Sequence, residues 1–96
     1  MRPSEALSTH RQTIREIVAR HLARNTRVFG SVARGDDSDN SDLDVLVDPL
    51  PGATLLDLGA MQVELEETLG LRVDLLTPGD LPTAFRDRVL REAVAV

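Results

Sequence analysis

The chain contains no cysteine and no lysine, and its only aromatic residues are Phe29 and Phe85. The missing cysteines exclude disulfide bonds, a thiolate nucleophile and a zinc site of the thiolate kind. Two aromatic rings are too few for a platform that stacks the bases of single-stranded nucleic acid. No apolar run is long enough to span a bilayer, and residues 1–10 lack the apolar core of a signal peptide. We therefore expect a soluble, cytoplasmic protein.

The charges that are present are unevenly distributed along the chain. Residues 1–34 carry seven arginines against Glu5 and Glu16, whereas residues 35–96 carry four arginines against fourteen acidic residues, for a net charge of −5. The arginine-rich part fits a solvated helix face, but it also suits an acidic partner or nucleotide phosphates. The net acidity disfavours duplex DNA or RNA as the main ligand, because neutralised phosphates dominate such affinities. The length of 96 residues predicts a single domain, residues 1–96.

Helical and strand-like patterns alternate along the sequence. Apolar residues at helical spacing predict long helices, and short β-type runs lie between them. We expect Thr54 and Asp57 to cap the second long helix, Gly70 to close it, and Asp80 to cap the last one. The predicted elements are helix 4–24, strand 27–29, short helix 31–34, strand 41–48, helix 54–70, strand 72–76 and helix 80–93.

This order predicts an α/β (α+β) fold in which helices cover one sheet of three or more strands. The pattern does not distinguish a parallel sheet from a mixed one. In the 41–48 strand, Leu43, Val45 and Val47 should face the helices, whereas Leu46 shares the polar face. The expected apolar stripes of the last two long helices are Leu55, Leu58, Leu65 and Leu69, and Leu81, Phe85 and Val89.

Gly30 and Ser31 stand where the first strand turns into the short helix. Free backbone N–H groups at a helix start suit a phosphate, glycine lets the backbone approach a ligand closely, and the serine hydroxyl adds a donor. Taken alone, a Gly-Ser pair is also compatible with an ordinary turn. It gains meaning only from the acidic residues that follow.

Asp42 and Asp44 lie two residues apart on a strand, so both point to the same face at a spacing of roughly 6–7 Å. Asp74 lies in the third strand, where aspartate is uncommon. Each of them, taken singly, also fits a solvent-exposed strand face. Together they form an acidic cluster that is costly unless a divalent cation compensates the charge, and carboxylate oxygens suit Mg²⁺ or Mn²⁺.

The segments GSVARG (residues 30–35) and SDLDVLV (residues 41–47) closely resemble the signature of the polymerase-β-like nucleotidyltransferase superfamily. Within it, the short chain resembles the minimal nucleotidyltransferases, the antitoxin partners of HEPN-domain toxins. With the Asp74 strand and the terminal helices included, the resemblance extends over nearly the whole chain. It implies a palm-like fold with a small mixed sheet.

The resemblance also implies roles for individual residues. Gly30 and Ser31 would hold the β- and γ-phosphates of ATP, and Arg34 would contact the triphosphate. Asp42 and Asp44 would bind two Mg²⁺ ions, and Asp74 the ion nearest the acceptor hydroxyl, for an in-line displacement at the α-phosphorus. For Arg34, a contact with the acidic loop of residues 36–39 is the competing interpretation.

The expected reaction moves AMP from ATP onto a hydroxyl, and the resemblance implies a tyrosine of a HEPN toxin as its acceptor. The chain lacks the second domain that larger relatives use to hold a base or an acceptor, so we expect another protein to complete the site. Two alternatives stay open: an antitoxin that neutralises its partner by contact alone, and a nucleotidyltransferase for a small molecule. A nucleotide-sugar glycosyltransferase also uses Asp-x-Asp, but it needs a longer chain.

Overall fold

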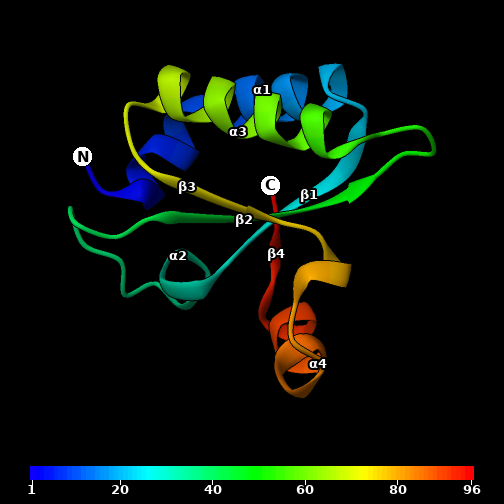
Figure 1. Ribbon diagram of the computed structural model, residues 1–96. Helices are drawn as coiled ribbons and strands as arrows, with labels where there is room; N and C mark the ends of the chain where they lie inside the picture. The colour runs from blue at the N-terminus through cyan, green and yellow to red at the C-terminus, as the bar shows by residue number, and fades with distance from the viewer.

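A four-stranded mixed sheet, with the strand order β3-β2-β1-β4, organises the computed structural model, which describes all residues from Met1 to Val96 (Figure 1). Strand β1 is antiparallel to both β2 and β4, and β2 is parallel to β3. The mixed sheet and the α+β class are therefore confirmed. The elements are α1 (Pro3–Arg20), β1 (Ala23–Phe29), α2 (Gly30–Arg34), β2 (Leu43–Pro49), α3 (Leu55–Leu69), β3 (Val73–Leu76), the 3₁₀ helix η1 (Pro78–Asp80), α4 (Thr83–Glu92) and β4 (Val94–Ala95).

The two sides of the sheet are covered very differently. Helices α1 and α3 lie side by side over one face, whereas α2, η1 and α4 lie on the other side (Figure 1). The first face holds the main core, into which β2 sends its predicted apolar side chains. That core consists of Leu7, Ile14, Ile17, Val18, Ala23, Val28, Leu43, Val45, Val47, Met61, Leu65, Leu69 and Val73.

The alternation predicted for β2 holds, but one residue of the second face is not exposed. Leu46 was expected beside the aspartates on the polar face, but it is fully buried and lies outside the main core. Strand β2 is interior to the sheet, and η1 packs against it on the way to α4. The packing of η1 against β2 therefore accounts for the burial of Leu46, which lies two residues beyond Asp44.

The helix boundaries follow local capping chemistry. Helix α3 begins as predicted, because Asp57 accepts from the Thr54 N–H at 2.7 Å and the Asp57 N–H donates back to the Thr54 hydroxyl. Gly70 ends it with a left-handed φ of 68°. The predicted role of Asp80 is wrong, since its carboxylate accepts from the Thr77 N–H at 3.0 Å and caps η1 rather than α4.

Two boundaries near the start of the chain also differ from the prediction. Helix α1 ends at Arg20 rather than at residue 24, because Leu22 takes a positive φ of 63° that a helix does not allow. Strand β1 then begins at Ala23 and contains a bulge between Arg24 and Arg27. The two-residue strand β4 was not predicted.

The expected apolar stripes are only partly right. In α3, Leu65 and Leu69 are buried and Leu58 packs against the core, but Leu55 is 85% exposed. No residue of α4 is buried; Phe85 is 47% exposed, with the Arg88 guanidinium 5.5 Å from the centre of its ring. Since α4 packs against α2 rather than the main core, its apolar residues have little to bury against.

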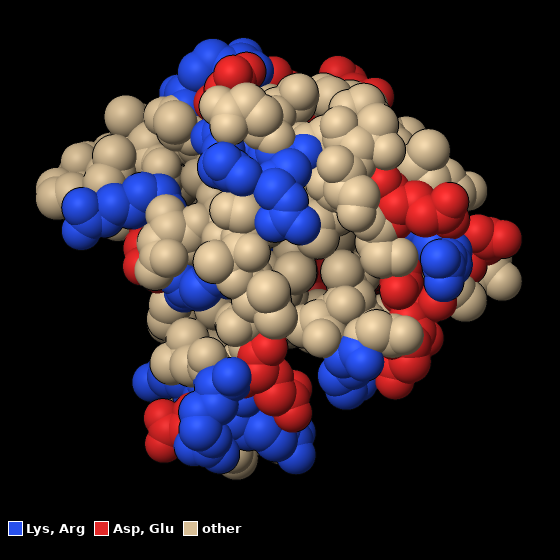
Figure 2. Space-filling view, turned by 180° about the vertical axis from the view of Figure 1, so that it is seen from behind, with Lys and Arg blue, Asp and Glu red and all other residues tan.

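Basic and acidic side chains gather in different parts of the surface. Seen from behind, one group of arginines lies at the bottom of the view, over α4, and others lie at the centre and top, whereas acidic side chains gather mainly on the right (Figure 2). None of the helices has the length and apolar character that crossing a membrane requires.

Candidate active site

The sheet register brings two of the predicted aspartates directly opposite each other. In the parallel pair β2–β3, Asp44 and Asp74 are Cα partners, and strands paired in this way lie about 4.8 Å apart. On its other side Asp44 is the partner of Phe29, the last residue of β1. The acid therefore stands between the strand that carries Asp74 and the turn that carries Gly30.

Gly30 is required here for two independent reasons. It has a positive φ of 69°, which residues with side chains rarely adopt. In addition, a Cβ atom at this position would overlap the Oδ2 atom of Asp44. Glycine at this position therefore lets the first turn of α2 contact the Asp44 carboxylate directly.

Asp44 is the most electrostatically perturbed residue of the cluster. Burial, and then the negative charges of Asp74 and Asp42, raise its pKa to about 6, against an opposing effect of the Arg34 guanidinium. A raised pKa means that the folded chain does not by itself compensate the ionised carboxylate. Such a perturbed acid, placed beside a glycine turn of the backbone, is typical of a functional site.

Asp42 precedes β2 and is held by a residue to which the sequence alone assigned no role. Its Oδ1 atom lies 3.0 Å from Nε of Arg72, whose side chain is 80% exposed. The Arg72 carbonyl accepts from the N–H of Leu43 at 2.9 Å, which fixes the start of β3 beside the start of β2. The signal in the sequence was a lone basic residue two positions before Asp74.

Arg34 and Ser31 complete the set of predicted residues. Nε of Arg34 lies 3.5 Å from Oδ2 of Asp36, as the competing interpretation expected, although its charge also reaches Asp44. The Ser31 carbonyl accepts from the Asp36 N–H at 3.0 Å, and the Ser31 side chain makes no hydrogen bond within the chain. Its hydroxyl is therefore available to a ligand.

Comparison with known proteins identifies this arrangement. A family model described as a nucleotidyltransferase domain matches residues 10–96. The chain belongs to this family. The expectation that it is a nucleotidyltransferase is thereby confirmed.

Its relatives are proteins of similar size. The protein adenylyltransferase MntA of Thermococcus cleftensis is 40% identical over 94% of this chain and 88% of that protein. A Methanocaldococcus jannaschii protein, provisionally named a protein adenylyltransferase, is 42% identical over 83% of this chain and 86% of its own length. A solved structure provisionally described as a minimal nucleotidyltransferase has a TM-score of 0.87 at 44% identity, and the match covers 97% of this chain and 95% of that one.

The acids of this nucleotidyltransferase domain have the donor chemistry that a hard divalent cation prefers. In this structure, however, no three carboxylates already converge as a finished metal centre. Asp42 is paired with Arg72, while Asp44 and Asp74 face each other across the strands. The unbalanced charge at Asp44 fits a cation, and a cation bound by all three acids would compete with the guanidinium that holds Oδ1 of Asp42.

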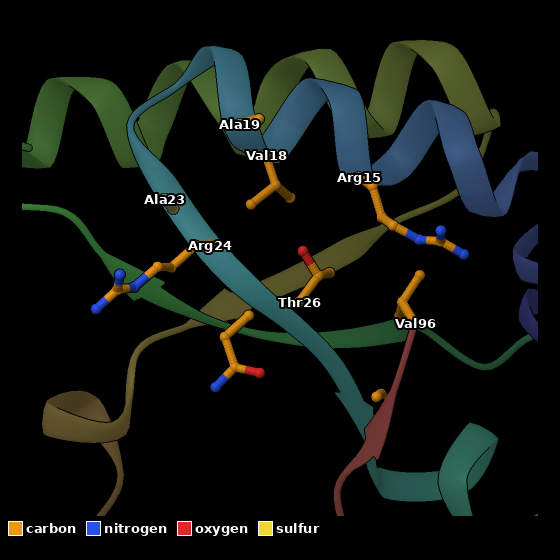
Figure 3. A pocket seen from close by; sticks show the side chains of 9 residues that line it. Arg15, Val18, Ala19, Ala23, Arg24, Thr26 and Val96 are labelled. Atoms are coloured by element: carbon orange, nitrogen blue, oxygen red, sulfur yellow. The ribbon is translucent and has the colours of Figure 1, made fainter.

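The one cavity of the nucleotidyltransferase domain, of about 340 Å³, lies away from these acids. It opens between α1 and β1, where Val18 and Thr26 point toward each other and Val96 closes one side (Figure 3). Arg15 and Arg24 extend to opposite sides of it rather than converging (Figure 3). None of its lining residues belongs to the predicted site. That site, called the acidic shelf below, consists of Asp42, Asp44 and Asp74 and lies outside the cavity.

Proposed function

We propose that the protein is a Mg²⁺-dependent protein adenylyltransferase that transfers AMP from ATP to a tyrosine hydroxyl of a HEPN-domain toxin and so acts as an antitoxin. The observation that carries the proposal is the contact of Gly30 with Asp44, opposite Asp74. It supports a site in which a phosphate-binding turn and metal-binding carboxylates meet. The activity named for the MntA relative supports the same conclusion.

The residues of the cluster divide into two sets. Asp42, Asp44 and Asp74 would hold Mg²⁺ or Mn²⁺, which when bound would lower the pKa of the acceptor hydroxyl and offset charge on the triphosphate. The backbone at Gly30 and the free hydroxyl of Ser31 would hold the β- and γ-phosphates. Because Gly30 contacts Asp44, phosphates bound at this turn lie next to the carboxylate cluster.

The chain's own residues would then orient the reaction. With the β- and γ-phosphates held at the turn, the α-phosphorus would lie near the carboxylate cluster, which an acceptor hydroxyl can reach because no cavity encloses it. The hydroxyl oxygen forms a new bond to the α-phosphorus, the bond to pyrophosphate breaks, and the hydroxyl proton is released. The acidic shelf disfavours a carboxylate acceptor, since its negative charge would be repelled.

A protein acceptor is favoured by the openness of the site. No cavity encloses the acids, so a partner surface would have to exclude water there. Solved neighbours of the same fold come from toxin–antitoxin complexes; one of them contains AMP-PNP and has a TM-score of 0.74 at 20% identity, covering 88% of this chain and 69% of that one.

The test uses the purified protein, Mg²⁺, α-labelled ATP and a HEPN-domain protein encoded beside it. Mass spectrometry should find AMP on a tyrosine of the partner with the wild type, and a growth assay should show relief of toxicity. Omission of Mg²⁺ and the Asp44→Asn variant should each abolish the label. If growth is rescued equally by wild type and Asp44→Asn, with no AMP on the partner, neutralisation by contact replaces this proposal.

A further inference from the structure

Helix α1 begins at a residue that cannot cap it. Its N-cap position is Arg2, whose side chain offers no acceptor to the free N–H groups of the first turn. Glu5 accepts from the Arg2 N–H at 3.1 Å, which satisfies one donor. The N–H of Ser4 is satisfied from elsewhere in the chain, by Oδ2 of Asp37 at 2.9 Å.

Asp37 is the one charged side chain among the buried residues of the protein. It is only 8% exposed, whereas the side chain of Asp39 in the same loop is 78% exposed. Burial by itself would raise the pKa of Asp37, but the hydrogen bond from Ser4 and the nearby Arg2 guanidinium outweigh burial and lower it. The start of α1, whose first segment runs to a kink at His10, is also a favourable place for a negative charge.

The loop that contains Asp37 joins the two halves of the candidate site. It begins after α2, the helix that contains Ser31, and ends at Asp42, just before β2. Within it, Ser38 and Ser41 form a closed turn, with the Ser38 N–H donating to the Ser41 hydroxyl at 2.9 Å and the Ser41 N–H donating to the Ser38 carbonyl at 3.0 Å. Asp37 is the point at which this segment is fastened to the helical layer, on the side where α1 begins (Figure 1).

We propose that Asp37 is a positioning residue: by capping α1 it holds the loop that sets Asp42 against Asp44 and the phosphate-binding turn. The side chain itself touches neither metal nor nucleotide. The inference rests on the proposed function only in taking a divalent metal and ATP as the ligands of the site. Helix α1 then has a second role beside packing, because it anchors the loop between α2 and β2.

The test compares Asp37→Asn and Asp37→Ala with Asp39→Asn as a matched control. Asp39 lies in the same loop, and its carboxylate is also near the start of the chain, 3.8 Å from the Met1 amino group, but it is exposed. Mn²⁺ binding in the presence of ATP is measured by electron paramagnetic resonance at a temperature at which circular dichroism shows each variant to be folded. The Tm of each variant is recorded separately.

Asp37→Ala should weaken Mn²⁺–ATP binding by on the order of 10-fold, the lower end of the loss seen when a group bonded directly to a metal ligand is removed, because Asp37 acts on Asp42 only through the loop. Asp37→Asn keeps an acceptor oxygen and should lie between Asp37→Ala and wild type, and it supplies the decisive reading if the alanine variant does not fold. Asp39→Asn should bind like wild type. If the folded Asp37 variants have a lower Tm but unchanged Mn²⁺ affinity, the side chain serves stability alone and the proposal is wrong.

This readout is separable from the proposed function. A wild type that binds Mn²⁺–ATP but labels no partner would contradict the adenylyltransferase antitoxin and leave the role of Asp37 intact. Transfer of AMP by wild type, together with unchanged metal affinity in both Asp37 variants, would support the adenylyltransferase and contradict the role of Asp37. A wild type without any affinity for Mn²⁺–ATP would overturn both.

Discussion

Asp37 and Asp44 are both withdrawn from solvent, yet their surroundings shift their pKa values in opposite directions. At Asp37, burial opposes ionisation but is outweighed by the Ser4 N–H and Arg2, and the pKa falls. At Asp44, burial acts in the same way and the neighbouring acids add to it, so the pKa rises to about 6. Asp37 lies in the loop between α2 and β2, and Asp44 is the second residue of β2, so one short segment carries both carboxylates.

The two acids differ in which groups compensate their negative charge. The chain supplies Asp37 with a donor and a helix start, so its charge stabilises the fold. It supplies Asp44 with no hydrogen-bond donor and with more negative charge, so that charge costs stability until something from outside arrives. An uncompensated carboxylate with the Gly30 turn packed against it has the properties expected of a site for a cation and a phosphate.

The largest effect is expected from removal of the unsatisfied charge. Asp44→Asn keeps the shape of the side chain but should reduce AMP transfer to the detection limit, because metal binding is lost. Mass spectrometry of the partner and Mn²⁺ binding measure the two losses. Asp48→Asn is the matched control, since Asp48 lies in the same strand but pairs with Arg27 at 3.1 Å outside the site. A loss of transfer in the control as well would mean that the effect comes from the fold.

The pH dependence of stability should reveal what the ionised Asp44 carboxylate costs the metal-free protein. The pKa of Asp44 rises from an ordinary value of about 4 to about 6 on folding, so the folded state holds the proton more tightly. Without metal, the free energy of unfolding should therefore fall as pH rises from about 4 to 6. Because the side chain is only half-buried and solvent screens its neighbours, we expect this group to contribute roughly 1–2 kcal/mol to the fall. Above pH 6 the full cost is present.

Urea unfolding of the metal-free protein at pH 5 and pH 7.5 measures this effect, with Asp44→Asn as the reference that cancels all other titrating groups. Wild type should lose stability relative to Asp44→Asn between the two pH values, and saturating Mn²⁺ with ATP should abolish the difference. At Asp37 the sign is reversed: its contribution is present above about pH 4 and is lost on acidification. Equal pH profiles for wild type and Asp44→Asn would contradict the contrast between the two acids.

A side chain at Gly30 should disturb the site and the fold together. Gly30→Ala forces a non-glycine residue to a φ of 69° and drives the Asp44 carboxylate from its place. The left-handed backbone alone costs roughly 1–2 kcal/mol, and Mn²⁺–ATP affinity should fall because the ligand oxygen must move. Gly35→Ala is the control, with a similar φ of 79° but no atom within contact of an added Cβ. It should lose stability and keep its affinity.

The Asp44 half of this contrast could be predicted from the sequence, because it depends on local spacing. The alternation over 41–48 predicted that Asp44 shares a face with Asp42, and Gly30 at the end of a strand predicted a close backbone approach. What spacing could not supply was the register between β2 and β3, which makes Asp44 and Asp74 partners. Register is decided by packing of the whole sheet, and the family resemblance implied only that Asp74 joins the same metal site.

The missed features all depend on contacts between distant segments. Asp37 looks like any residue of a polar loop until the start of α1, 33 residues earlier, is brought to it. Arg72 and the fully buried Leu46 owe their environments to neighbouring strands and to η1. The exposure of Phe85 has the same origin, because the predicted stripe of α4 assumed a core that the second face of the sheet does not provide.

The proposed phosphate-binding part of the site depends on the Ser31 hydroxyl. Ser31→Ala removes a hydroxyl that makes no hydrogen bond within the chain, so stability should be unchanged. Loss of one hydrogen bond to a charged phosphate should weaken ATP use by about 1–3 kcal/mol, seen mainly in the KM for ATP. Ser38→Ala, in the adjacent loop turn, is a control in which the backbone bond to Ser41 remains. A change in Mn²⁺ affinity without a change in KM would place the serine on the metal side instead.

The smallest effect, and the one that most directly probes how the chain manages its own acids, is expected at Arg72. Its guanidinium is the nearest internal substitute for a cation, 3.0 Å from Asp42, but it is highly exposed, and such pairs contribute only about 0–1 kcal/mol. Arg72→Gln should therefore lower the metal-free Tm slightly. It should also enlarge the rise in Tm on adding Mn²⁺, because Asp42 no longer has a partner to give up and the cluster is less balanced. Arg91→Gln, on the far helix α4, serves as the control for loss of one positive charge. If Arg72→Gln instead reduces the Mn²⁺-induced rise, the guanidinium helps to hold the bound metal–nucleotide complex, and Asp42 does not have to exchange its partner at all.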